Sequence, residues 1–150
     1  MDALDKKAVA FLMLHGRATW ADLGQVLGLS APATADRVRK LENEGVIRGY
    51  AALPDPELLG YPLLAYVSVT LVSQRSRTAF LKAIGRMKEI LEAHHIAGED
   101  DYLLKVRCRN TQDLDRILAR ELKSKHGVAR TRTTIVLATA KETIKLPVAP

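Results

Sequence analysis

Apolar positions near the start of the chain recur with the period of a helix. Leu4, Ala8, Phe11 and Leu12 occupy positions i, i+4, i+7 and i+8. This spacing places four apolar side chains on one face of a helix over residues 4–15. The chain therefore begins with an amphipathic helix that needs a packing partner.

Two further helices follow, each with its own start and stop signals. The stretch Thr19 to Asp22 has the form of a capping box, so a helix begins there and ends about two turns later at Gly28, which suits a left-handed residue. Ser30 is an N-cap residue for a third helix that runs to Glu44. The side chains predicted to be buried in these two helices are Leu23, Val26, Leu27, Ala35, Val38 and Leu41.

The third helix begins with small, non-acidic residues, which allow a backbone to approach DNA closely. Arg37, one turn later, offers a guanidinium group to a guanine edge or a phosphate. These features favour a helix-turn-helix whose third helix enters the major groove. A three-helix bundle without DNA function, and a surface salt bridge of Arg37 with Asp36 or another acid, are the alternatives. The predicted DNA-contacting residues are Ser30, Ala31, Ala33, Thr34, Arg37, Lys40 and Arg48.

Beyond residue 54 the pattern changes to alternating strands and helices. Strands are expected over residues 63–72, 90–97, 102–107 and 131–140, and helices over 78–88 and 111–123. The order βαββαβ predicts a ferredoxin-like sandwich with both helices on one face of the sheet. We expect the uncovered face to be apolar and to form an interface. The helix residues expected inside are Phe80, Leu81, Ile84, Leu114, Ile117 and Leu118.

The fold class is therefore α+β with two domains. Residues 1–53 form the helix-turn-helix domain, which ends in a short linker strand at 50–53, and residues 54–150 form the βαββαβ domain. Pro54, Pro56 and Gly60 break regular structure at the junction.

Composition narrows the class of protein. A chain of 150 residues that is 47% hydrophobic can bury one ordinary core or two small ones. No stretch approaches the roughly 20 apolar residues of a membrane span, and acids and lysines occupy the place of a signal peptide, so we expect a cytoplasmic protein. A single cysteine, Cys108, excludes an intrachain disulfide and a multi-cysteine zinc site.

The net charge of +6 is unevenly distributed. Residues 1–50 contain seven lysines and arginines and six acids, so most of the excess lies downstream. Basic charge favours polyanion partners, but here it does not indicate where DNA binds.

Short motifs spread over nearly the whole chain resemble the Lrp/AsnC, or feast/famine, regulators. The motifs are Leu4-Asp5, Gly28-Leu29-Ser30, Arg37-Val38, Leu41-Glu42, Gly45-Val46-Ile47, Gly49-Tyr50, Gly98 to Tyr102, and Thr131-Arg132-Thr133 with Lys141. The resemblance implies a sequence-specific regulator of transcription in amino-acid or related metabolism, with double-stranded DNA as partner. It also implies dimers that join sheet to sheet, assembly up to octamers, and a small effector, such as an amino acid, bound between subunits.

By this resemblance the effector pocket combines a turn with the facing strand of a neighbouring subunit. Gly98 allows close approach, Asp101 can pair with an ammonium group, and Thr133 or Thr134 can supply a hydroxyl. An ordinary hairpin turn is the alternative for the turn. Three successive acids at 99–101 also suggest a basic amino acid as effector. The full predicted set is Gly98, Glu99, Asp101, Tyr102, Thr133, Thr134 and Val136; no cofactor or metal is expected.

Two other functions are compatible with the pattern. Some haem-biosynthesis decarboxylases resemble this regulator fold and use histidines near a tetrapyrrole, but His94 and His95 should face opposite sides of their strand. A nucleoid-organising protein would instead wrap DNA without an effector, using the basic second domain as a track. Steep salt dependence and little sequence preference would distinguish wrapping from specific regulation.

Overall fold

The computed structural model describes residues 1–123 and 127–148. The chain divides into two compact units, one of residues 1–53 with the C-terminal segment from Lys141, and one of residues 54–140. The sequence placed that C-terminal segment in the second domain, whereas its contacts are with the first unit. Residues 124–126 and 149–150 of the predicted second domain lie outside the described residues. No helix in the described part of the chain is long and apolar enough to cross a membrane.

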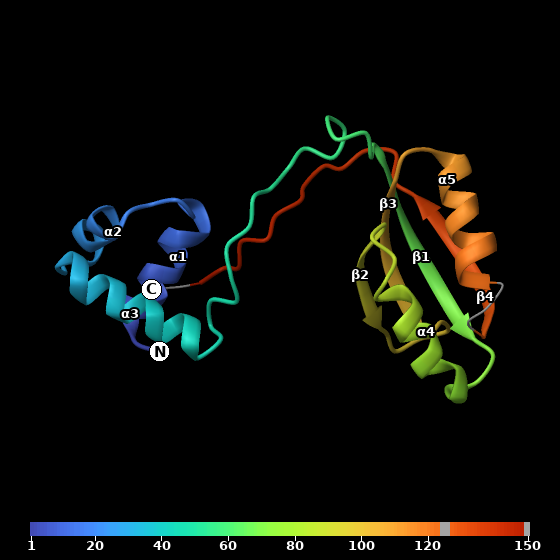
Figure 1. Cartoon of the computed structure of the whole chain (residues 1–150), viewed down its shortest axis with the longest axis horizontal. Coiled ribbons are helices and arrows are strands. Elements are labelled where there is room, and N and C mark those ends of the chain that lie inside the picture. The colour runs from blue at the N-terminus through green and yellow to red at the C-terminus, as the bar shows by residue number, and fades with distance from the viewer. Residues whose placement is uncertain (124–126, 149–150) are drawn as a thin grey trace. The chain divides into compact units, whose positions relative to one another are not determined.

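Three helices make up the first unit: α1 (Ala3–Leu14), α2 (Trp20–Leu27) and α3 (Ala31–Asn43) (Figure 1). The predicted capping box at Thr19 and Asp22 is confirmed, and Ser30 caps α3. Gly28 ends α2 with a φ of 71°, in the left-handed region that glycine adopts without strain. The core of the unit consists of Ala8, Leu12, Leu23, Leu27, Val38 and Leu41.

The contact between α2 and α3 depends on a buried glycine. A Cβ atom at Gly24 would lie 2.6 Å from the carbonyl oxygen of Leu29 and 3.1 Å from Oγ1 of Thr34. The Thr34 hydroxyl donates a hydrogen bond to the carbonyl oxygen of Ser30 at 2.9 Å. Thr34 is fully buried, so the prediction that it lies on an exposed face is wrong. Its position shares the inward face with Val38 and Leu41, at the helical spacing of four and seven residues.

The predicted linker strand at 50–53 is absent, because no strand of the described residues pairs with this segment. One side chain nevertheless anchors the start of the linker to α3. The Tyr50 hydroxyl donates to a carboxylate oxygen of Glu42 at 3.0 Å. Partial burial, and then the Glu42 carboxylate, raise the pKa of Tyr50 to about 12.

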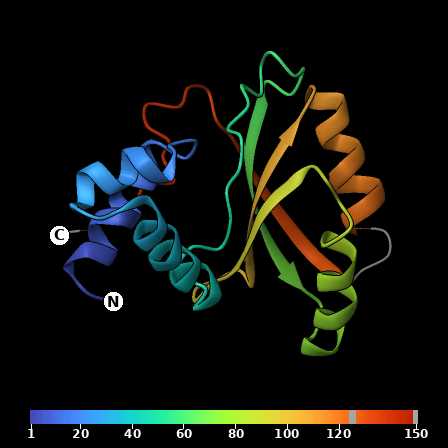
Figure 2. The ribbon, with the colours of Figure 1, turned by 60° about the vertical axis from the view of Figure 1, so that its left-hand side comes forward.

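The second unit has the predicted βαββαβ order. Its strands are β1 (Leu63–Leu71), β2 (Ile90–His95), β3 (Tyr102–Cys108) and β4 (Val128–Ile135), in the spatial order β2-β3-β1-β4 with antiparallel neighbours. Between β1 and β2 lie a short 3-10 turn, η1 (Gln74–Ser76), and α4 (Arg77–Ile84); between β3 and β4 lie α5 (Thr111–Asp115) and a π-helical segment, η2 (Arg116–Lys123). Figure 2 shows both helical segments on one side of the sheet.

Several details of the prediction for this unit are wrong. The first helix, expected to run to residue 88, ends at Ile84, and the second strand, expected to run to residue 97, ends at His95. Strand β4 was expected over 131–140, but its ladder with β1 begins at Val128 and ends at Ile135, opposite Ala65. β4 ends there because β1, its antiparallel partner, begins at Leu63 and offers almost no further residues to pair with. Leu81 was expected inside and is 40% exposed, since Phe80 and Ile84 occupy the inward side of α4 one turn apart.

The uncovered face of the sheet is polar rather than apolar, which corrects the expectation from sequence. Strand alternation directs Ala65, Val67 and Val69 of β1 toward the helices, where they are fully buried. The alternate residues of β1, such as Tyr66 and Ser68, point to the other face. So do the residues of β3 and β4 that pair with these alternate residues. By register this face is built mainly from polar residues, with Leu64, Tyr66 and Leu103 as its large apolar members; the full set is Leu64, Tyr66, Ser68, Thr70, Glu92, His94, Leu103, Lys105, Arg107, Arg130, Arg132 and Thr134.

Candidate DNA-binding surface and ligand site

The outer face of α3 carries charged side chains that are exposed and do not pack in the core. Asp36 and Lys40 lie opposite the buried positions and are each 73% exposed, and Arg39 beside them is 65% exposed. Arg39 pairs with Asp36 at 2.5 Å. The sequence prediction included Lys40 but missed Asp36 and Arg39. Counting 100° per residue from the buried stripe would have found both.

Arg37 lies at the edge of this face and is bound to α1. Its Nη1 atom contacts both carboxylate oxygens of Asp2, at 2.9 and 2.8 Å, and also the carboxylate of Asp5. The Arg37 side chain is 26% exposed. The N–H of Asp5, and then Arg37, lower the pKa of Asp2. The salt-bridge alternative for Arg37 is therefore present, with Asp2 and Asp5, which form the capping box of α1, in place of Asp36. Contact with DNA stays a prediction.

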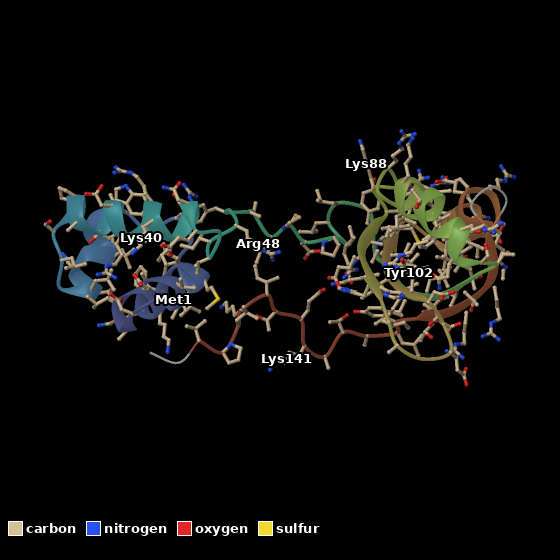
Figure 3. The ribbon with its side chains drawn as sticks, turned by 90° about the horizontal axis from the view of Figure 1, so that it is seen from below. Met1, Lys40, Arg48, Lys88, Tyr102 and Lys141 are labelled. Atoms are coloured by element: carbon tan, nitrogen blue, oxygen red, sulfur yellow. The ribbon has the colours of Figure 1, made fainter. Side chains whose placement is uncertain are left out.

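The other predicted DNA-contacting residues occupy different environments. Ser30 and Ala33 are exposed at the start of α3, and Ala31 is half-buried. Arg48 is exposed in the segment that follows α3 (Figure 3). Thr34 is buried and has no exposed surface to offer.

The turn between β2 and β3 contains a buried acid that sequence reasoning did not select. Asp100 has a side chain that is 3% exposed. It accepts a hydrogen bond from Thr70 at 2.8 Å, and it contacts Arg132 at 2.8 Å and Arg130 at 3.4 Å. The Thr70 hydrogen bond, and then the two arginines, lower the pKa of Asp100. No local sequence signal separated Asp100 from its two acidic neighbours.

The neighbouring acids are also engaged within the chain. The Leu71 N–H donates to Oδ2 of Asp101 at 2.7 Å, and the Asp101 N–H donates to the carbonyl oxygen of Val69 at 2.9 Å. Arg132 also contacts Glu99, at 3.7 Å. Arg130 and Arg132 of β4 thus pair with Asp100 and Glu99, whereas the Asp101 carboxylate has a backbone partner and, among the described residues, no cation. A basic effector stays a prediction.

Replacing Asp100 with asparagine should lower the unfolding temperature at neutral pH. Because the folded-state pKa of Asp100 lies below its ordinary value, its stabilising effect is complete at neutral pH and is lost as the pH falls through that lowered pKa. Thermal unfolding should therefore separate the two proteins most at pH 7, and the difference should begin to shrink as the pH falls below about 4, the ordinary pKa of aspartate. Glu99→Gln is the control, since the Glu99 side chain is 81% exposed. Equal unfolding temperatures for Asp100→Asn and wild type at pH 7 would contradict the expectation.

Tyr102 at the start of β3 is buried beneath the helices. Its ring packs against Phe80 with centroids 5.0 Å apart and against His95 at 5.3 Å. Its hydroxyl is buried without a hydrogen-bond partner in the described part of the chain. Such an unpaired hydroxyl is uncommon, and Tyr102 directly follows the turn at 98–101 along the chain.

Within one chain the predicted effector residues form two separate groups. The turn adjoins Val69 and Leu71 of β1, whereas the Val136 N–H donates to the carbonyl oxygen of Leu64 at 2.9 Å. Five strand residues separate these points on β1, or about 16 Å at the usual rise per residue. Thr134 is exposed and Thr133 half-buried between them.

The two adjacent histidines lie on opposite faces of β2. His95 contacts Tyr102 on the helix side, and His94 contacts Glu92 at 3.2 Å on the uncovered face. Among residues 1–123 and 127–148, no group of three or more histidine, cysteine, aspartate or glutamate side chains is arranged to hold a metal ion.

Comparison with known proteins identifies both units. The model of the AsnC-type helix-turn-helix domain matches residues 1–42, and that of the Lrp/AsnC ligand binding domain matches residues 64–146. The leucine-responsive regulatory protein of Haemophilus influenzae is 39% identical over 145 residues, which cover 95% of this chain and 87% of that protein.

Solved structures of similar fold cover nearly the whole chain. A transcriptional regulator of Neisseria meningitidis, solved in complex with L-Met, superposes with a TM-score of 0.93 at 30% identity, covering 98% of this chain and 96% of that one. AsnC of E. coli superposes with a TM-score of 0.89 at 28% identity, covering 97% of this chain and 99% of that one. The chain therefore belongs to the Lrp/AsnC family of DNA-binding, effector-responsive transcriptional regulators.

Proposed function

We propose that the outer face of α3 reads the operator, and that an amino acid bound by the second unit controls this binding. The observation that carries the proposal is that the two faces of α3 differ: one is buried in the core of the unit, and the other is exposed and charged. The inward face holds the α2–α3 turn together, while Ala33, Asp36, Arg39 and Lys40 face outward and are exposed. A helix built in this way can enter a major groove without loss of its packing.

Within this surface, Lys40 and Arg39 supply contacts to phosphates or guanine edges, and the small side chain of Ala33 permits close approach. Arg37 supports the surface by joining α3 to the capping box of α1. Arg48 in the linker is a further phosphate contact.

An amino acid is the effector that the comparisons favour. The second unit matches a ligand-binding domain, and the Neisseria meningitidis regulator was solved with L-Met. We place the pocket at the turn from Gly98 to Tyr102 together with residues 133–136 of a second copy, since one chain keeps these groups apart. This arrangement requires a dimer, which would also provide two α3 helices for half-sites about one helical turn apart.

The experiment that tests the proposal is a selection of bound DNA fragments by the purified protein, with and without pooled amino acids. A regulator enriches a defined site, binds it about 1,000-fold or more above other DNA, and changes its affinity with one amino acid. A nucleoid-wrapping protein enriches no site. A tetrapyrrole absorbance band in the purified protein would instead favour the enzyme alternative.

Two substitutions on α3 should separate a DNA contact from a supporting residue. Lys40→Ala should weaken operator binding and reduce the slope of log K against log salt by about 0.9, the value expected for a single phosphate. Arg37→Ala should weaken operator binding while leaving oligomer size unchanged and the salt slope near the wild-type value, because its guanidinium is already paired. Fluorescence anisotropy over a range of salt measures both. Unchanged affinity of Arg37→Ala would show that Arg37 neither reads nor supports the surface.

A further inference from the structure

The excess positive charge of the second unit is concentrated around α4. Residues 73–88 contain five lysines and arginines and no acid. The whole unit, residues 54–140, contains 14 lysines and arginines and ten acids, so without this segment nine cations face ten acids. Segment 73–88 thus accounts for the net positive charge of the unit. We call this set the α4 patch; its members are Arg75, Arg77, Lys82, Arg86 and Lys88.

The secondary structure directs these side chains to solvent. Phe80 and Ile84 hold α4 against the sheet, so Lys82, half a turn away from Phe80, lies on the outer side. Arg75 belongs to η1 before the helix, and Lys88 follows the helix and points out from the unit (Figure 3). All five members of the patch are exposed.

Nearby acids do not neutralise the patch. Glu89, the next acid along the chain, pairs with Arg116 at 2.9 Å. Glu121 of η2, the segment that packs beside α4, also pairs with Arg116. No member of the α4 patch forms an ion pair in the described part of the chain. This sets the patch apart from the arginines of β4, whose charge is shared with Asp100.

We propose that the α4 patch is a second DNA-binding surface, which contacts the phosphate backbone of DNA flanking the operator. The inference rests on the proposed function. If the helix-turn-helix binds an operator, the covalent link between the units holds the α4 patch close to the same DNA molecule. A tethered surface meets its ligand at a high effective concentration, so even weak contacts add to affinity. Five cations without ion-pair partners or interleaved aromatics fit phosphates, which are read by charge, better than base edges.

The test compares two duplexes, one limited to the selected operator and one carrying the same operator with long flanks. The patch variant is Lys82→Gln with Lys88→Gln in the full chain. The matched control is Lys141→Gln with Lys145→Gln, which removes the same charge from two exposed lysines of the C-terminal segment. Wild type and control should bind the flanked duplex more tightly than the short one. The patch variant should lose this gain, and its salt slope should fall by about 0.9 for each phosphate that it no longer neutralises.

A charge-retaining variant, Lys82→Arg with Lys88→Arg, should keep the gain, which shows that charge rather than folding is responsible. Equal gains in the patch variant and wild type overturn the inference, as does the absence of any gain in wild type. The first of these results is also expected if the patch binds an acidic protein instead. If wild type selects no operator at all, the proposed function fails before the patch is tested.

Discussion

Gly24→Ala should unfold or loosen the helix-turn-helix and abolish specific DNA binding. The new Cβ would lie 2.6 Å from a backbone oxygen of Leu29, a distance that requires α2 and the turn to separate. Overpacking of this kind costs roughly 1–3 kcal/mol. Helix propensity alone predicts the opposite sign, since alanine is favoured over glycine inside a helix by about 1 kcal/mol. The substitution therefore distinguishes tertiary packing from local preference.

Urea unfolding followed by the fluorescence of Trp20 measures this effect, because Trp20 is the only tryptophan and begins α2. Gly16→Ala is the control: its Cβ would have its nearest neighbour at an ordinary 3.7 Å, and it should leave both stability and operator affinity near wild type. A stabilised Gly24→Ala protein that binds the operator normally would contradict the packing of α2 against α3.

Phe80→Ala should give the largest loss of stability in the second unit, about 3–5 kcal/mol for a large aromatic side chain removed from a core. Phe80 is fully buried and packs against Tyr102 with ring centroids 5.0 Å apart. The cavity would lie beside the turn at 98–101, so effector binding should weaken as well. Hydrogen exchange of the β1 and β3 amides, with urea unfolding of the full chain, measures the loss.

Leu81→Ala is the matched control for this prediction. Leu81 is the next residue on the same helix and is 40% exposed, so its truncation should cost about 1 kcal/mol or less, as is usual away from the core. The two variants also test a point on which sequence and structure differ, because the apolar pattern placed both side chains inside. Equal losses for the two would mean that α4 is rotated from the orientation described.

Local signals were sufficient wherever a residue acts on its own neighbours in the chain. The caps Thr19 and Ser30 and the left-handed Gly28 are decided by hydrogen bonds and sterics within four residues. The same holds for the inward stripes of α3 and for the alternation along β1. Because these rules need no knowledge of distant residues, they were enough to predict the helix-turn-helix and the βαββαβ order.

The charged partners of Arg37 and Asp100 were not local. Arg37 was expected to contact DNA or a near neighbour, but it reaches Asp2 and Asp5, more than 30 positions away. Asp100 looked like one of three equivalent acids, yet only the packing of Thr70 and two β4 arginines around it makes it the buried member. An ion pair between segments depends on their relative placement in space, which no spacing along the chain encodes.

For the helix-turn-helix unit, the sequence by itself determined where each helix begins and ends to within about a residue, and which helix we propose as the reading helix. Tertiary structure alone decided which residues that helix presents: Thr34 is withdrawn into the contact with Gly24, Arg37 is held by α1, and Asp36, Arg39 and Lys40 remain outside. The physical reason is that capping and periodicity are properties of a single segment. Exposure and ion pairing depend instead on what a second segment covers.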